Sequence, residues 1–276
     1  MSPLIRKIYF RLSPRGRRLA RRLYYLPSDT FRRLFVKSDV LVPPKGMSFV
    51  GSGNFELIGD KFFKHISEVT KILPSASVLD IGCGIGRIAR PFTGFLNLEG
   101  KYTGFDILGY GINWCKNRYR KFKQFSFEHY PLKNDLYYPD ASANAAEFVF
   151  PYNTQSFDLI ILISVYTHMQ KDEVENYFKQ ISRVIKDNGF CYASFFLTDE
   201  NTKSDFFMHD FGEYKLHDLR VKDANVAFDK NYIIDFANSV GLKAVNVFPG
   251  WWSTGFRNDA VDFQDVIVFK KSHNNN

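Results

Sequence analysis

The segment from Val78 to Arg90 constrains the fold of this chain more than any other, because it combines a strand, a glycine-rich turn and helical spacing. An apolar run that ends at Ile81 predicts a buried strand, and three alternating glycines predict a turn directly after it. A glycine-rich turn between a strand and a helix lets the backbone approach a ligand and points free N–H groups at it. The segment therefore predicts a cofactor site. The glycines are Gly82, Gly84 and Gly86, and the positions with helical spacing are Ile85, Ile88 and Ala89.

Two carboxylates narrow the nature of that cofactor. Asp80 lies two residues before the first glycine, and Asp106 ends the next apolar run, about twenty residues beyond the turn. An acidic side chain at the second place can accept both hydroxyls of a ribose. The glycine spacing differs from the Gly-x-Gly-x-x-Gly of nicotinamide enzymes, and Asp80 would repel a pyrophosphate held at the turn. The pair favours a nucleoside ligand that carries an ammonium group.

These motifs resemble those of the class I S-adenosylmethionine (SAM) dependent methyltransferases. Residues 78–86 look like the first motif of the family, 104–107 like the second, and 156–160 with the strand after it like the fourth. The order and spacing are also similar, and the resemblance covers about residues 50–270. It implies a Rossmann-like α/β fold with helices on both faces of a seven-stranded, mostly parallel sheet whose seventh strand is antiparallel.

The resemblance also implies a set of cofactor contacts. Asp80 and the glycine turn would surround the methionine end of SAM, Asp106 would bind the ribose, and Ile107 would lie against the adenine. The product would be S-adenosylhomocysteine, and no metal is implied. The full set of expected cofactor contacts is Asp80, Gly82, Cys83, Gly84, Gly86, Asp106, Ile107 and Ser164.

Length and composition are those of one α/β domain with appendages. The 276 residues contain no run of eighteen apolar residues and no apolar segment of the signal-peptide kind. The three cysteines, at positions 83, 115 and 191, show neither metal-ligand nor disulfide spacing. We therefore expect a protein of a reducing, cytoplasmic compartment.

The net charge of +8 is concentrated in the first 38 residues, where eleven Lys or Arg and one Asp give +10, so the remaining residues sum to −2. Apolar residues recur at helical spacing among these basic residues from Leu4 to Leu12 and again at Leu19 and Leu23, which predicts two short amphipathic helices separated by Pro14. Such a segment can bind an anionic membrane interface, and an arm that is solvated or docked on its own domain is equally consistent with the pattern. Binding to nucleic acid and a role as an organellar transit peptide are less favoured.

Along the chain, we expect residues 1–44 to form this basic arm, residues 45–271 the methyltransferase domain, and residues 272–276 a disordered tail. Residues 131–155 form a long connection without a clear period, and residues 199–230 interrupt the alternation of strands and helices as a possible substrate lid. The other elements are expected as listed: helices over 55–73, 109–121 and 172–186, the last ending at Asn188-Gly189 through a left-handed cap, and a helix ending at Gly241; strands over 125–129, 158–165, 190–197, 242–248 and 264–270.

Polar and aromatic side chains follow the fourth and sixth expected strands, at the strand ends where ligands bind in open α/β sheets. His168 is the best-placed general base for a reaction at a hydroxyl group, although a histidine that anchors the turn by bonding the backbone is equally consistent with its position. Tyr166 and Thr167 are weaker candidates for substrate contacts. Trp251 and Trp252 could stack on an apolar or sugar face, and core packing is the alternative for at least one of them.

The identity of the methyl acceptor is narrowed mainly by the absence of the motifs that mark other classes of methyltransferase. The fourth strand is followed neither by the Asn/Asp-Pro-Pro-Tyr/Phe pattern of amino-methylating DNA enzymes nor by the Pro-Cys of cytosine-C5 enzymes, and the paired-glutamate loop of protein arginine enzymes is missing. Residues 87–91, 104–107, 112–115, 150–152 and 164–169 resemble bacterial glycan-related members of the family. We therefore expect O-methylation of a sugar hydroxyl on a polysaccharide or lipid-linked glycan, with the arm peripheral on the inner membrane face. The alternatives are a methyltransferase of a lipid, a quinone or another small molecule, and a non-catalytic SAM-binding module.

Overall fold

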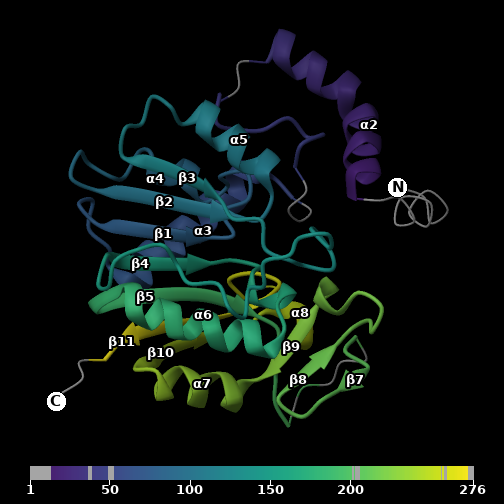
Figure 1. The fold of residues 1–276 in the computed structure, drawn as a ribbon. Coiled ribbons are helices and arrows are strands. Elements are labelled where there is room, and N and C mark those ends of the chain that lie inside the picture. The colour runs from purple at the N-terminus through teal and green to yellow at the C-terminus, as the bar shows by residue number, and fades with distance from the viewer. Residues whose placement is uncertain are drawn as a thin grey trace.

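The structure is a computed structural model that describes residues 14–36, 39–48, 53–200, 202, 206–255, 257 and 260–272. Its helices and strands follow the chain as shown in Figure 1. Their bounds are α2 (Pro14–Phe35), α3 (Phe55–Thr70), β1 (Ser77–Ile81), α4 (Ala89–Phe92), β2 (Lys101–Asp106), α5 (Gly109–Arg118), β3 (Phe125–His129), β4 (Phe157–Leu162), η1 (Tyr166–His168), α6 (Lys171–Val184), β5 (Ile185–Phe195), β6 (Leu197–Thr198), β7 (His209–Asp210), β8 (Tyr214–Leu216), η2 (Lys222–Ala224), β9 (Val226–Asp229), α7 (Lys230–Ser239), β10 (Leu242–Phe248), α8 (Trp251–Thr254) and β11 (Asp265–Lys271).

A seven-stranded sheet forms the centre of the molecule, in the order β10-β11-β5-β4-β1-β2-β3. Neighbouring strands pair in parallel from β5 through β3, whereas β11 runs antiparallel to both β10 and β5. The order reverses at β1, where the chain moves first to β2 and β3 and later to β4 on the other side. Open α/β sheets bind ligands beside such a reversal, outside the carboxyl ends of the strands.

Alternate residues of the strands face two separate cores. On β4, Leu159 and Ile161 join the core that holds α3, α4 and α5, whereas Ile160 and Leu162 join the core that holds α6 and α7. Strands covered on both faces are apolar throughout, as the sequence of β4 is. The expected α/β architecture, including the antiparallel seventh strand, is confirmed.

The predicted strands β3 and β10 have the observed bounds, and the other strands differ by a few residues. The end of α6 was predicted wrongly. The helix ends at Val184, because Ile185 is buried and pairs with Phe157 at the start of β4. Asn188 does adopt a left-handed conformation, with φ of 62°, but it lies within an irregularity of β5 and does not cap the helix.

The residues after the glycine turn are also less helical than their spacing suggests. Only Ala89–Phe92 form an α-helix, and a series of turns connects Gly86 to it. The apolar residues of this segment are nevertheless buried: Ile85, Ile88 and Ala89 are at most 6% exposed. The helical spacing of these apolar residues therefore reflects their burial on one face of a compact turn, not a long helix.

Helix α2 is longer than expected. It begins at Pro14, a favoured first helical position, and continues through Pro27 to Phe35. It contacts the rest of the chain through Asp29, whose carboxylate accepts the backbone N–H groups of Lys45 and Gly46, and through Arg18, whose guanidinium lies 4.6 Å from the centre of the Tyr110 ring. The first expected amphipathic helix, from Leu4 to Leu12, lies outside the described residues, as do residues 273–276 of the expected tail. Among the described helices, none is both long and apolar enough to cross a membrane.

The segment 199–230, expected as an interruption, contributes most of a second sheet with the order β6-β9-β8-β7. Its strands are two to four residues long. They lie beyond the carboxyl end of β5, beside α7 and α8 (Figure 1). This small sheet brings Asp223 of η2 next to the end of β4.

Candidate functional site

The glycine turn after β1 has a backbone that side chains would obstruct. Gly82, Gly84 and Gly86 have φ values of 71°, 58° and 79°, in the left-handed region that favours glycine. A Cβ atom on Gly82 would lie 2.5 Å from Cγ2 of Val165, which follows β4. The turn therefore packs closely against the end of β4, and its backbone borders the cavity described next.

A cavity of ≈ 110 Å³ lies at the carboxyl ends of β1, β2 and β4. Gly82 and Gly84 of the turn line it together with residues that follow the neighbouring strands and with residues of α6 and of the long connection 131–155. The structure thus brings together six of the residues predicted from sequence: Gly82, Gly84, Asp106, Ile107, Ser164 and His168.

Asp106 is the acidic group of this cavity, and it is only 7% exposed. One carboxylate oxygen accepts the N–H of Gly84 at 2.8 Å and the other accepts the N–H of Leu108 at 2.7 Å. Burial raises the pKa of Asp106 to about 6, while these two hydrogen bonds act in the opposite direction. Each oxygen retains a second lone pair, so the carboxylate can accept two hydroxyl groups of a ligand.

Ser164 follows β4 in a left-handed conformation, with φ of 59°. Hydrogen bonds hold this unusual backbone: the N–H of Ser164 donates to Oγ of Ser194 at 2.7 Å, and its own Oγ donates to Oε1 of Gln264 at 2.9 Å. Non-glycine residues in this conformation cost energy and concentrate at functional sites. The turn after β4 is therefore fixed by the side chains of Ser194 in β5 and of Gln264, the residue before β11.

His168 lies in the short helix η1 and is oriented by Asp223. Its Nδ1 is 2.9 Å from the backbone oxygen of Asp223, and because that oxygen can only accept, Nδ1 carries the proton and Nε2 carries the lone pair. Burial lowers the pKa of His168, and the carbonyl groups of Asp223 and Ala224 oppose this effect. At neutral pH the imidazole is uncharged and able to accept a proton.

Several residues of the site were not predicted from sequence. Asn134 donates from Nδ2 to the backbone oxygen of His168 at 2.9 Å, and Tyr137 packs edge-on against the His168 ring. Glu173 of α6 also lines the cavity, where burial raises its pKa to about 8. Asp223 accepts the N–H of Asp135 and the side-chain amide of Gln170. In the sequence, only their place in the long connection 131–155 pointed to Asn134 and Tyr137. Glu173 had only the position typical of a residue that caps the first turn of a helix.

Three of the expected cofactor residues do not line the cavity with the others. Asp80 is 2% exposed, and its carboxylate accepts a hydrogen bond from the hydroxyl of Tyr102. Burial raises the pKa of Asp80 to about 7. Cys83 is buried in the core on the side of α3 and α5, and the oxygen of Gly86 accepts the hydroxyl of Tyr119.

The four expected substrate residues also lie away from this cavity. Tyr166 is fully buried and stacked between Phe178 and Phe195, and Thr167 is fully buried beside Gln264. The two tryptophans belong to α8: Trp252 donates from Nε1 to the carboxylate of Asp265 and packs on Phe196 and Phe207, whereas Trp251 contacts Phe263.

In the part of the chain that the structure describes, no three His, Cys, Asp or Glu side chains are grouped so that they could hold a metal ion. The donors and acceptors at the cavity are instead suited to an organic ligand. They include the Asp106 carboxylate, the backbone of the glycine turn and the neutral imidazole of His168, together with the side chains of Lys133, Asn134 and Glu173. Ile107 adds an apolar surface beside them.

Comparison with known proteins supports this view of the site. The family model described as a methyltransferase domain matches residues 79–193, which include the glycine turn, Asp106 and His168. Solved structures with a similar fold include a SAM-dependent methyltransferase from Methanosarcina mazei, at 18% identity, with a TM-score of 0.52 and coverage of 73% of this chain and 94% of that chain.

Two further similar structures cover more of this chain. The 1,6-didemethyltoxoflavin-N1-methyltransferase of Burkholderia thailandensis, solved with 1,6-didemethyltoxoflavin and S-adenosylhomocysteine, is 14% identical with a TM-score of 0.53, covering 95% of this chain and 92% of that chain. A protein from Pyrococcus horikoshii is also 14% identical, with a TM-score of 0.55 and coverage of 88% and 99%. At such identities, the likeness shows a shared fold.

Proposed function

The chain belongs to the class I SAM-dependent methyltransferases, and from this premise we propose that it methylates a sugar hydroxyl of a polysaccharide or lipid-linked glycan. The observation that carries the cofactor part of the proposal is Asp106, a buried carboxylate with two free acceptor positions beside the glycine turn. The residues of the cavity fit SAM in chemistry: a ribose has two hydroxyls to donate, and Ile107 offers an apolar surface to an adenine.

When bound, SAM supplies an electrophilic methyl group on a positively charged sulfur. We assign the ribose contact to Asp106, the adenine contact to Ile107, and the methionine end to the backbone of Gly82 and Gly84 with Ser164 nearby. Asp80, Cys83 and Gly86 do not line the cavity, and we assign them the role of holding the glycine turn in its conformation. Ligand cavities commonly measure about 300–1,000 Å³. The observed ≈ 110 Å³ is smaller, so lining residues have to move apart when a whole cofactor enters.

His168 is our choice for the general base. Its Nδ1 proton is held by Asp223, so Nε2 is the nitrogen that can take the proton of an acceptor hydroxyl. Such proton transfer contributes about 10²–10⁴-fold to a rate. Because Asp223 lies within residues 199–230, this segment orients the base, although none of its described residues lines the cavity itself. Acceptor contacts by Tyr166, Thr167, Trp251 and Trp252 stay predictions.

The glycan acceptor is supported by a sequence resemblance to glycan-related members of the family, which lies in residues 87–91, 104–107, 112–115, 150–152 and 164–169. A small-molecule acceptor, such as a quinone or a lipid headgroup, is the second candidate. It is favoured by the limited volume of the cavity and by the fold shared with the Burkholderia enzyme, which was solved with a small heteroaromatic compound. Either acceptor is compatible with His168 as the base.

We also propose that the arm, residues 1–44, places the enzyme on the cytoplasmic face of an anionic membrane. Helix α2 exposes large apolar side chains, among them Leu23 at 61% and Phe35 at 72%, alongside its arginines. A basic helix that also exposes apolar side chains binds the interface of an anionic bilayer by burying them among the headgroups. Such an arm would bring residues 45–271 close to a lipid-linked acceptor.

The experiment that tests the proposal compares Asp106→Ala with Asp158→Ala. Asp158 is a matched control because its carboxylate also accepts a backbone N–H, that of Ser77. This hydrogen bond lies at the amino ends of β1 and β4, opposite to the cavity. We expect calorimetry to show SAM binding weakened roughly tenfold or more by Asp106→Ala, since hydrogen bonds to charged groups contribute about 1.5–3 kcal/mol each. Asp158→Ala should bind SAM as the wild type does.

The same proteins are then incubated with methyl-labelled SAM and with glycan, lipid and small-molecule fractions. Label in a glycan fraction, lost in Asp106→Ala, is the expected result. Label only in a small molecule would establish the second candidate. Folded wild-type protein that binds SAM but labels none of the fractions would support the non-catalytic alternative, and a failure to bind SAM would refute the cofactor assignment.

A further inference from the structure

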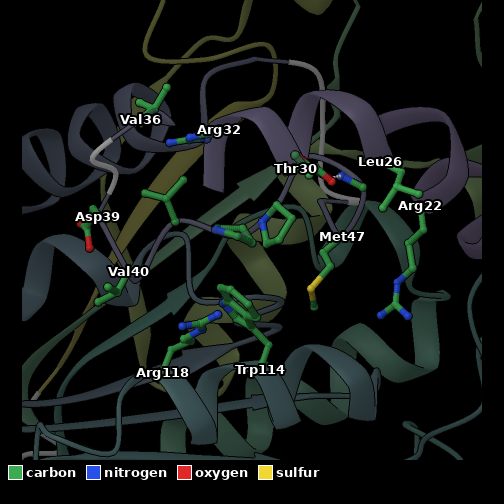
Figure 2. A pocket seen from close by; sticks show the side chains of 15 residues that line it. Arg22, Leu26, Thr30, Arg32, Val36, Asp39, Val40, Met47, Trp114 and Arg118 are labelled. Atoms are coloured by element: carbon green, nitrogen blue, oxygen red, sulfur yellow. Dashed lines mark hydrogen bonds between the residues drawn. The ribbon is translucent and has the colours of Figure 1, made fainter. Parts of the chain in front are cut away.

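A second and larger cavity, of ≈ 800 Å³, lies between α2, the loop 39–47 and α5. Figure 2 shows Arg22 and Leu26 projecting from α2 on one side, Trp114 and Arg118 rising from α5 on another, and Met47 between them. This volume falls in the range of ligand-binding cavities. None of the residues assigned above to SAM or to proton transfer lines it.

The charges of this cavity are only partly neutralised. Two of the charged lining residues form ion pairs. A guanidinium nitrogen of Arg32 lies 3.6 Å from a carboxylate oxygen of Glu56, and a carboxylate oxygen of Asp39 lies 3.6 Å from a guanidinium nitrogen of Arg90. The Asp29 carboxylate accepts two backbone N–H groups. By contrast, within the described chain neither Arg22 nor Arg118 forms an ion pair; the guanidinium of Arg118 lies 4.4 Å from the centre of the Trp114 ring.

Trp114 adds a third donor without an acceptor. Its Nε1 is buried and has no hydrogen-bond partner among the described residues. A buried donor left without an acceptor costs about 1–3 kcal/mol. Because this buried N–H is closed off from the cavity, the groups that can meet a ligand there are the two guanidinium groups that form no ion pair in the described chain. They match a ligand with several anionic oxygen atoms, such as a phosphate group.

The rest of the cavity is apolar. Leu26 of α2 and Val36, the residue after this helix, line it together with Val40 and Met47 of the following loop. Leu26 and Val40 are also 57% and 67% exposed, so the apolar lining continues onto the outer surface. A free phosphate would leave this part unused, whereas the chains of a lipid would cover it.

We propose that this cavity binds the phosphate of an anionic phospholipid, with Arg22 and Arg118 as donors and the lipid chain against Leu26 and Val40. The proposal rests on the proposed membrane association of the arm and adds to it a specific headgroup site. It implies that membrane binding depends on α5 as well as on α2.

The test is binding of the full chain to vesicles of phosphatidylcholine with and without phosphatidylglycerol, measured by co-sedimentation. The matched pair is Arg118→Ala and Arg120→Ala, because Arg120 is an exposed residue outside the cavity and both changes remove one positive charge. A basic residue near an anionic surface contributes about fivefold to binding. We expect at most that loss for Arg120→Ala and more than about tenfold for Arg118→Ala. Trp114→Phe keeps a ring under Arg118 and should bind as the wild type does.

The outcomes separate the two proposals. Equal losses in Arg118→Ala and Arg120→Ala, with wild-type binding intact, would overturn the headgroup site and leave the membrane association standing. No binding of wild-type protein to phosphatidylglycerol vesicles would overturn both. Soluble glycerol phosphate forms the last arm: if it competes fully with the vesicles, the site is for a free phosphate ester and the lipid assignment is wrong. Calorimetric SAM binding by each variant verifies that the methyltransferase domain is folded.

Discussion

His168 shows how a single residue of the site combines orientation with chemistry. Its Nδ1 is committed to the backbone oxygen of Asp223, and burial keeps the ring neutral by lowering its pKa. The alternative at this position is a histidine that only anchors the turn. The two roles differ in what a glutamine would do there, because a glutamine amide can donate to the Asp223 oxygen but cannot take a proton at pH 7.

We expect His168→Gln to lower kcat by about 10²–10⁴-fold while leaving SAM affinity unchanged, because the lost step is proton transfer. The wild-type rate should fall on acidification below pH 6.5, where the imidazole becomes protonated, and the variant should lack this acidic limb. The measurement is kcat as a function of pH with the labelled acceptor. A variant with near wild-type kcat would show that His168 is structural.

Motif spacing predicts some residues of the site and not the partners of others. Asp106 and the glycines were identified because motif spacing reports a strand, a turn and the end of the next strand. Asp80 carries the same kind of signal, but its carboxylate is taken up by Tyr102, a residue 22 positions away that the register of β1 with β2 brings near it. The spacing of residues along one strand does not predict which side chains of a neighbouring strand will form hydrogen bonds with them.

At the scale of elements, α5 holds the glycine turn in shape. A Cβ atom on Gly111 would lie 2.4 Å from the backbone oxygen of Gly84, so the helix approaches the turn as closely as a glycine allows. The oxygen of Gly86 also accepts the hydroxyl of Tyr119, just beyond the helix. The conformation of the cofactor turn therefore depends on the helix that follows β2.

Gly111→Ala should destabilise the protein by about 1–3 kcal/mol, because the added methyl group forces the helix and turn apart and outweighs the gain in helix propensity. It should also weaken SAM binding in the protein that remains folded. Gly94→Ala is the control, since a Cβ atom there would meet only the oxygen of Pro91 at 3.9 Å. Thermal unfolding and calorimetry measure both effects, and equal behaviour of the two variants would contradict this role for α5.

Elements differ in how well the sequence predicted them. The strands of the large sheet were located because each places apolar residues between turn residues, continuously in most of β4 and interrupted by polar residues in β3 and β10. The predicted bounds of β3 and β10 match to the residue. The small sheet was missed, since strands of two to four residues carry no period and depend on pairing across the chain. The end of α6 was placed too late because Ile185, which suits either a helix or a strand, pairs with β4.

At the scale of the whole molecule, burial of acidic groups around the site has an energetic cost. Burial raises the pKa of Asp80 to about 7, of Asp106 to about 6 and of Glu173 to about 8. The folded protein therefore retains protons that the unfolded chain releases at lower pH. For such groups the contribution to stability is complete below the unfolded pKa and declines as pH rises toward the folded pKa.

Glu173 allows this contribution to be isolated, because a glutamine there resembles the protonated acid and its amide oxygen can still accept the N–H of Gln170. Between the ordinary pKa of 4.5 and the folded value of about 8, the charged form of Glu173 is progressively more costly in the folded state. The wild-type free energy of unfolding should thus fall relative to that of Glu173→Gln by up to about 1.4 kcal/mol per pH unit across this window. Urea unfolding at a series of pH values measures the difference, with Glu147→Gln, a change at an exposed carboxyl, as the control.

Two outcomes would contradict this prediction. Parallel curves of unfolding free energy against pH for wild type and Glu173→Gln would mean that Glu173 is solvated in the folded protein. A difference confined to pH values below 4.5 would have the wrong sign for a buried acid.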